Sequence, residues 1–272
     1  MAQPNSIKVE KLSRLIGTAN APIIIDVRNA EDLAADERLI PASRKHSHAS
    51  VSDWGKGLAG KSAVVICHHG AKLSEGAAAW LRHLGCDAVN LEGGFVAWEE
   101  AKLPLVPITK IPPRDKEGRT HWVTRNRPKI DRIACPWLIR RFVDPAAVFL
   151  FVTPQEVSGV AERFNATPFD IENTHWSHLG QLCTFDLMVE EFGLKSDALQ
   201  RLATIIRGAD TARLDLAPEA AGLLAASLGL SRIFANNLEQ LEAGMLLYDA
   251  FYRWCRDATD EIHNWPSNKV KP

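Results

Sequence analysis

The chain has 272 residues, a length that predicts two domains. Of these residues 46% are hydrophobic and 24% are charged, a composition typical of a globular protein. It contains no run near the ~18 apolar residues of a membrane span, no signal peptide at its first six residues, and no cysteine pattern of a disulfide scaffold. Residues 111–130 hold six basic and two acidic side chains, yet a pI near 6.8 argues against a nucleic-acid partner. We therefore expect a cytoplasmic protein without a membrane partner.

Strands and helices alternate in the first hundred residues. The β-branched runs at residues 23–27 and 63–67 are typical of strands buried on both faces, and residues 88–91 form a third predicted strand. Between the last two, residues 74–84 predict a helix that stops at Gly85. Because parallel strands need such a crossover helix, this order predicts a parallel sheet.

A cysteine stands where the second of these strands ends. Cys67 is therefore expected at the edge of the sheet where open α/β folds bind ligands. The helix that follows begins nearby, and a helix N-terminus favours the thiolate form of a cysteine. The intervening loop adds positive charge and a glycine that lets amides turn inward. Its residues are His68, His69, Gly70, Ala71 and Lys72. On this feature alone, a buried structural cysteine is the alternative interpretation.

Four motifs in a fixed order favour the chemical interpretation. They are Asp26-Val27-Arg28, Leu39-Ile40-Pro41-Ala42, Cys67-x-x-Gly70-x-Lys72 and Leu91-Glu92-Gly93-Gly94-Phe95-x-x-Trp98. Over about residues 6–107 the series closely resembles the rhodanese family of sulfurtransferases. The resemblance implies an α/β domain with a five-stranded parallel sheet, helices on both faces, and no cofactor.

The same resemblance implies roles for individual residues. Cys67 takes sulfane sulfur from thiosulfate or a persulfide donor, forms a persulfide, and passes the sulfur to cyanide or a thiol. The loop amides from His68 to Lys72 hold the terminal sulfur, while Asp26 and Arg28 support the strand ends. A phosphatase on this fold needs an arginine six residues after the cysteine, where Leu73 stands, so that enzyme class is disfavoured.

Two departures from the family pattern predict local differences. Arg38-Leu39 and Pro41-Ala42-Ser43 replace the usual Gly-His and Pro-Gly-Ala sequences, so the turn is expected to be reshaped. Lys72 stands in place of the loop arginine, keeping the charge but losing the two-pronged grip on an oxyanion. A protein persulfide is therefore a second candidate donor beside thiosulfate.

A proline-rich segment divides the chain. Residues 105–119 contain three prolines and a glycine and are expected to form neither a helix nor a central strand. We expect a first domain at 1–108, a linker at 109–119 and a second domain at 120–272. The second domain is predicted to be mainly α-helical with a few strands. The strands are predicted at 122–124 and 148–152, and the helices at 132–142, 154–164, 185–192, 197–207, 218–228 and 238–259.

The last of these helices carries an apolar stripe at helical spacing, which predicts core packing rather than a cofactor site. Its residues are Leu238, Leu241, Met245, Tyr248 and Tyr252. Near the start of the second domain, Asp131 is the expected N-cap of the helix that contains Cys135 and Pro136.

Several segments of the second domain resemble the chromate-resistance domain of ChrB-type proteins. They include Asp131-Arg132, Cys135-Pro136-Trp137, His175-Trp176-Ser177-His178, Cys183-Thr184-Phe185-Asp186 and Ile206-Arg207-Gly208-Ala209-Asp210. The resemblance spans roughly residues 120–260. It implies a bacterial role in chromate response or resistance and no established reaction.

The polar residues of these segments are predicted to form one pocket, with Trp137, Trp176 and Phe185 as apolar walls. The pocket residues are Arg132, Cys135, His178, Cys183, Asp186, Arg207 and Asp210. Three hypotheses stay open. The arginines and His178 hold chromate or another oxyanion; His178, Cys183 and Cys135 bind a soft metal; or the residues form a buried polar network without a ligand.

Together these patterns predict a rhodanese-type sulfurtransferase, with Cys67 as nucleophile, coupled to a chromate-resistance domain. The expected partners are a small-molecule sulfur donor, a thiol acceptor, and chromate or another oxyanion. The competing hypothesis is a non-catalytic sensor or binding protein for an oxyanion or metal, in which the rhodanese domain is an accessory module.

Overall fold

The first part of the chain is built on a five-stranded parallel sheet. In the computed structural model, which describes residues 5–261, every pairing in this sheet is parallel, as expected. The strand order is β1 (Ser6–Ile7), β6 (Asp87–Leu91), β5 (Ser62–Ile66), β2 (Ile23–Asp26) and β4 (Ser43–Lys45).

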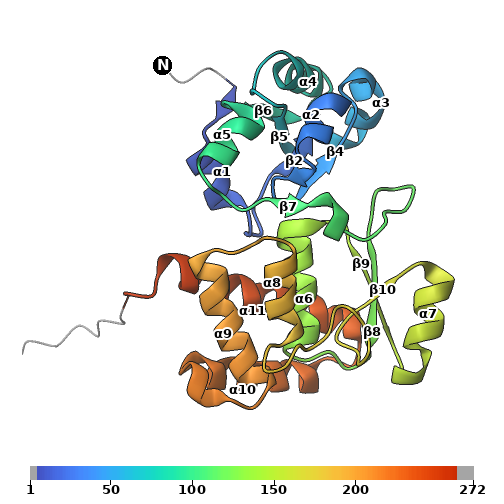
Figure 1. Cartoon of the computed structure of the whole chain (residues 1–272), viewed down its shortest axis with the longest axis vertical. Helices are drawn as coiled ribbons and strands as arrows, with labels where there is room; N and C mark the ends of the chain where they lie inside the picture. Colours follow the sequence, from blue (N-terminus) through green and yellow to red (C-terminus); the bar gives the residue numbers. More distant parts are fainter. Residues whose placement is uncertain (1–4, 262–272) are drawn as a thin grey trace, which may run out of the picture.

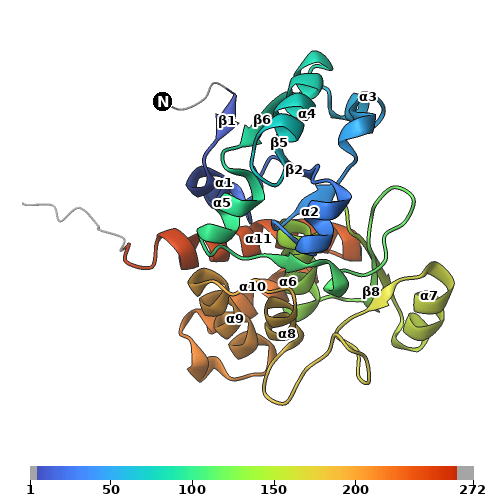
Figure 2. The same cartoon turned by 45° about the horizontal axis from the view of Figure 1, so that its top comes forward.

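Helices cover both faces of this sheet (Figure 2). Alternate residues of a strand point to opposite faces, so β5 supplies Val65 to one core and Val64 to the other. One face packs against α3 (Val51–Trp54) and α4 (Lys72–His83), and the other packs against α1 (Val9–Leu15) and α5 (Gly94–Glu100). α2 (Ala30–Ala35) follows β2, and the turns η1 (His48–Ser50) and η2 (Gly55–Leu58) flank α3.

The proline-rich segment lies between the two parts of the molecule (Figure 1). It forms the edge strand β7 (Val106–Pro107), which pairs antiparallel with β3 (Arg38–Leu39). The 3₁₀ turn η3 (Ile108–Lys110) follows. As predicted, the segment contains neither an α-helix nor a central strand.

The second part combines a small parallel sheet with a set of helices, as predicted. The sheet has the order β10 (Thr167–Pro168), β8 (His121–Arg125) and β9 (Val148–Val152), of which the two-residue β10 was not predicted. Each predicted helix is present with shifted ends. They are α6 (Asp131–Leu138) continued by the π-turn η4 (Ile139–Val143), η5 (Pro154–Glu156) with α7 (Val157–Phe164), α8 (Thr184–Glu191), α9 (Asp197–Asp210), η6 (Leu214–Leu216), α10 (Glu219–Ile233) and α11 (Asn237–Asp257).

The long helix α11 packs its predicted stripe into the core, with one exception. Leu241, Met245, Tyr248 and Tyr252 are buried, but Leu238 is 50% exposed. The prediction is wrong for Leu238 because this residue lies in the first turn of α11, next to the capping residue Asn236, whose side chain accepts the Leu238 amide. Among the described residues, no helix is both long and apolar enough to cross a membrane.

A single hydrophobic core joins the two parts. Trp98 and Leu105 of the first part belong to the same buried cluster as Phe142, Leu199 and Tyr252 of the second. The core therefore does not stop at the proline-rich segment.

The turn after β3 contributes to this junction. Ala42 adopts a positive φ of 63° and donates its amide to the carbonyl of Phe142, 2.6 Å away. The turn thus differs from the family sequence and contacts the second part of the chain.

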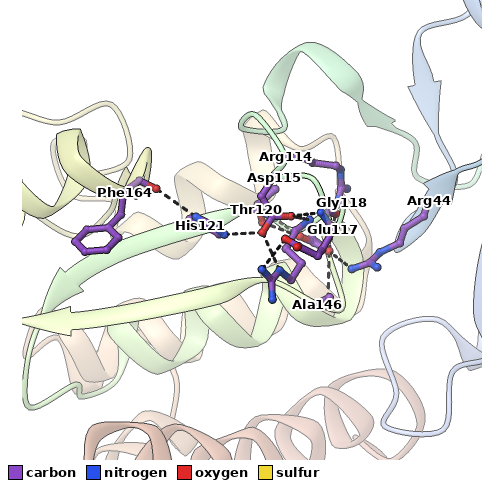
Figure 3. Close-up of polar contacts among 11 residues, drawn as sticks. Arg44, Arg114, Asp115, Glu117, Gly118, Thr120, His121, Ala146 and Phe164 are labelled. Carbon is purple, nitrogen blue, oxygen red and sulfur yellow. Dashed lines mark hydrogen bonds and ion pairs between the residues drawn. The ribbon is translucent and has the colours of Figure 1, made fainter. Parts of the chain in front are cut away.

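Polar residues from different parts of the chain meet at the same junction, among them Arg44, Arg114 and Thr120 (Figure 3). Asp144, which is fully buried, accepts a hydrogen bond from Arg44 of β4 at 2.8 Å and pairs with Arg114 of the proline-rich segment at 3.2 Å. It also accepts the amide and hydroxyl of Thr120, at 2.7 and 2.8 Å. These contacts hold the pKa of Asp144 below its usual value despite its burial.

Candidate functional sites

Cys67 lies immediately beyond β5, at the carboxyl edge of the parallel sheet, where it was expected. Its side chain is buried, with 6% exposure. The thiol donates to the carbonyl oxygen of Ala71 at 3.2 Å, and its sulfur lies 3.1 Å from the hydroxyl of Ser74 in the first turn of α4. The sulfur is therefore held inside the loop that connects β5 to α4.

The amides of this loop are available for an anion. Those of His68 to Ala71 donate to no group among residues 5–261, whereas the Ser74 amide in the first turn of α4 donates to the carbonyl of Ala71 at 2.9 Å. The side chain of Asn90 fixes the loop by donating to the carbonyl of Gly70 at 2.9 Å. A Cβ atom on Gly70, whose φ is +71°, would lie 2.3 Å from the carbonyl oxygen of Leu91, so the loop needs glycine here.

The loop side chains differ in their placement. His68 is partly buried, and its ring lies 4.4 Å from that of the exposed His69. The Nδ1 atom of His68 is buried and has no hydrogen-bond partner among the described residues. Ala71 and Lys72 are exposed at the start of α4. Lys72 is thus the first residue of the helix whose first turn contacts the sulfur of Cys67 through Ser74.

Asp26 and Arg28 form a buried pair at the end of β2. Arg28 donates its Nε to Asp26 at 2.8 Å and its Nη2 to the carbonyl of Arg38 at 2.6 Å. Its guanidinium also lies 3.9 Å from the ring centroid of Phe95. These contacts tie the end of β2 to β3 and to α5, so they are consistent with a supporting role.

In the second part, Asp131 links two helices instead of capping its own. It is the first residue of α6, after Ile130 at the cap position, so the N-cap prediction is wrong. Its carboxylate accepts the amides of Thr184 and Phe185 at 2.7 and 3.1 Å, and these amides begin α8. Asp131 caps α8 because that helix starts beside the first turn of α6.

His178 lies at the centre of three carboxylates. Its Nε2 atom is 3.2 Å from Asp210, 3.4 Å from Asp170 and 3.6 Å from Asp131. Hydrogen bonds to Asp170 and Asp210 raise the pKa of His178 to about 10, whereas burial and the other two carboxylates raise the pKa of Asp131. Asp170, which follows Phe169 just after the unpredicted strand β10, was missed by the sequence analysis.

The predicted arginines of this region are already paired. Arg132 lies 3.2 Å from Asp170 and donates to the carbonyl of Asn126, and Arg207 donates to Asp186 at 2.7 Å. A dianion here would face the carboxylates that surround these guanidinium groups. The geometry therefore disfavours the oxyanion hypothesis for this site.

The two cysteines are also engaged and do not complete a metal site with His178. Cys135 donates to Asp131 at 3.6 Å, and Cys183 donates to Asp186 at 3.2 Å. Burial raises the pKa of both thiols well above the usual value, which disfavours the thiolate form that a metal needs. Among the described residues, the side chains grouped closely enough to share a metal ion are instead those of Asp131, Asp170 and His178. His178 therefore stays a candidate ligand, whereas Cys135 and Cys183 are replaced by the two aspartates.

The aromatic residues predicted as pocket walls belong to the core. Trp137 stacks on Phe185, and Trp176 stacks on Phe192, with ring centroids 6.4 and 4.9 Å apart. All four side chains are buried. These side chains are packed in the hydrophobic core and do not form the walls of an open cavity.

Comparison with known proteins agrees with both halves of this description. A family model of the rhodanese-like domain matches residues 8–101, and a model of the ChrB C-terminal domain matches residues 122–255. The chain therefore contains a rhodanese-like domain followed by a ChrB C-terminal domain. Protein ChrB of Cupriavidus metallidurans is 34% identical over 146 residues, which is 53% of this chain and 43% of that protein. The chain thus matches less than half the length of this curated relative.

Solved structures resemble the first part of the chain. A rhodanese-related protein from Thermoplasma volcanium is 30% identical, with a TM-score of 0.33, over 38% of this chain and 98% of its own. A rhodanese-like domain protein from Staphylococcus aureus is 27% identical, with a TM-score of 0.32, over 35% of this chain and 91% of its own.

Proposed function

We propose that this protein is a sulfurtransferase in which Cys67 carries sulfane sulfur. The observation that most supports this function is the position of the Cys67 sulfur inside its loop. The loop amides from His68 to Ala71 have no acceptor among residues 5–261. A terminal sulfur on Cys67 would be a negatively charged acceptor for such amides. The rhodanese-like domain that contains this loop supports the assignment.

The reaction has two displacement steps. The Cys67 thiolate attacks the outer sulfur of thiosulfate, a sulfur–sulfur bond forms, and sulfite leaves with the electron pair of the broken bond. A thiolate or cyanide then attacks the terminal sulfur, and the Cys67 thiolate leaves. A protein persulfide serves equally well as donor, with a thiolate as the leaving group in the first step.

The ChrB C-terminal domain is proposed to couple this chemistry to chromate resistance in a bacterial cytoplasm. The domains are assigned to residues 1–108 and 120–272, with 109–119 as a connecting segment. The shared core and the pairing of Arg44 with Asp144 support mechanical coupling, because a shift of one part disturbs the other. No metal or organic cofactor is needed for the transfer.

Cyanolysable sulfur tests the proposal against a purely binding function. The purified chain should accept sulfur from thiosulfate and release thiocyanate with cyanide, and Cys67→Ser should abolish both. Cys86→Ser is the matched control, because Cys86 is buried at the far end of α4 and donates to the carbonyl of Lys61. Unchanged turnover in the Cys67→Ser variant would refute the role of Cys67 as the sulfur carrier. No bound sulfur and no thiocyanate formation in the parent chain would favour the non-catalytic alternative.

A further inference from the structure

We propose that Asp131, Asp170 and His178 bind one divalent first-row transition ion. The three side chains come from separate segments: Asp131 from the start of α6, Asp170 from the second position after β10, and His178 from the loop before α8. Their ligand atoms all lie within 4.8 Å of one another. The proposed site contains neither of the predicted cysteines and is independent of sulfur transfer.

The spacing fits a coordinated ion. Nitrogen and oxygen ligands of tetrahedral zinc, at about 2.0–2.2 Å from the ion, stand about 3.4 Å from each other. The Nε2 atom of His178 lies 3.6 Å from Asp131 and 3.4 Å from Asp170. Imidazole with carboxylates selects zinc, iron, cobalt or nickel over calcium and magnesium, which favour oxygen alone.

The carboxylates are held in place by groups behind them. The remaining oxygen of Asp131 accepts the amide of Phe185 and the thiol of Cys135, at 3.1 and 3.6 Å. The remaining oxygen of Asp170 lies 3.2 Å from Arg132 and 3.4 Å from Arg125. The oxygens that face His178 accept hydrogen bonds from Thr184, from its amide to Asp131 at 2.7 Å and from its hydroxyl to Asp170 at 3.3 Å. Such outer contacts orient metal ligands.

The charge and burial of the group also favour a cation. Asp131 is fully buried and Asp170 is 8% exposed, so two carboxylates share a region with little water. Besides Asp131 and Asp170, a third carboxylate, that of Asp210, lies 3.2 Å from the Nε2 atom of His178. A single Nε2–H can donate to only one of these three carboxylates. An ion bound to several oxygens at once resolves this excess of acceptors.

An unpartnered hydroxyl on β8, the strand that pairs with β10, gives a further indication. Thr124 is fully buried, and its Oγ1 atom has no hydrogen-bond partner among the described residues. Strand alternation puts Thr124 on the same face of β8 as Trp122, and the pairing of β8 with β10 continues to Phe169, the neighbour of Asp170. A buried hydroxyl without a partner is unfavourable, and a ligand near this end of β8 would offset that cost.

The test uses the full chain, freed of metal by a chelator and titrated with Zn²⁺ and Co²⁺ by calorimetry and absorption spectroscopy. We expect one ion per chain and a Co²⁺ spectrum without a sulfur-to-metal charge-transfer band. His178→Ala should weaken Zn²⁺ binding by at least about 100-fold, and Arg132→Gln, which removes an outer contact, by about 10–100-fold. His178 is partly exposed and outside the core, so the variant should fold.

The control is His175→Ala, which removes a more exposed histidine of the same loop and should leave Zn²⁺ affinity unchanged. Cys67→Ser should also keep the ion, which separates this proposal from sulfur transfer. Stoichiometric binding that survives in His178→Ala, a charge-transfer band from a thiolate in the parent chain, or no binding of either ion would each overturn the proposal.

Discussion

Removing the Asp144 carboxylate should destabilise both parts of the chain. Asp144 is fully buried and holds Arg44 and Arg114 from the other side of the junction. Removing one partner of a buried ion pair costs about 3–5 kcal/mol, because the remaining charges lose their compensation. Both arginine side chains are 26% exposed and reach some water in the variant, so we expect Asp144→Ala to cost about 3 kcal/mol.

The free energy of unfolding in urea measures this cost. Asp144→Ala should lower the urea midpoint. Spectroscopic probes in the two parts should report the same single unfolding transition, because the two parts share a hydrophobic core. Arg213→Ala is the control, since Arg213 and Asp215 form an exposed pair whose loss costs about 0–1 kcal/mol. A loss below about 1 kcal/mol in Asp144→Ala would refute the argument that this carboxylate holds the junction.

The ion pairs of Asp144 also predict how the free energy of unfolding depends on pH. The pKa of Asp144 is lowered in the folded chain, so its stabilising contribution is fully present above the unfolded value of about 3.9. It is lost as the pH falls through the folded value. The difference in unfolding free energy between the parent and Asp144→Asn should therefore shrink below about pH 4. A difference that grows toward acid pH would contradict the assigned pKa direction.

Two further predictions concern the Cys67 loop. Lys72→Arg should lower the KM for thiosulfate, because a guanidinium binds an oxyanion in two places. Lys72→Ala should raise this KM with less effect on kcat. Steady-state kinetics measure both, and an unchanged KM in both variants would place the Lys72 ammonium outside the anion site. Gly70→Ala should abolish persulfide formation, measured by cyanolysis, because its Cβ would meet a backbone carbonyl at 2.3 Å. Gly76→Ala, in open space on α4, should keep the activity, and equal activity of both alanine variants would contradict the steric argument.

The sequence by itself determined the sheet of the first part and the position of its cysteine. Two β-branched runs, a helix between strands and a strand-end cysteine are local patterns, and local patterns suffice when hydrophobic period and chain order leave few topologies. The motif around Cys67 also marked Gly70, where contact with Leu91 explains the glycine. The short strand β10 escaped prediction because two residues carry no measurable period.

Only the tertiary structure decided the chemistry of the second part. Asp131 looks in sequence like the cap of its own helix, yet it caps α8, which begins 53 residues later. Asp170 joins His178 through a chain reversal that no local pattern specifies, since its φ of +50° is unusual for a residue other than glycine. The sequence analysis brought the arginines and cysteines together, but the paired carboxylates occupy the arginines and burial keeps the thiols protonated. Which polar groups remain for a ligand depends on such long-range partners, and these exist only once the chain is folded.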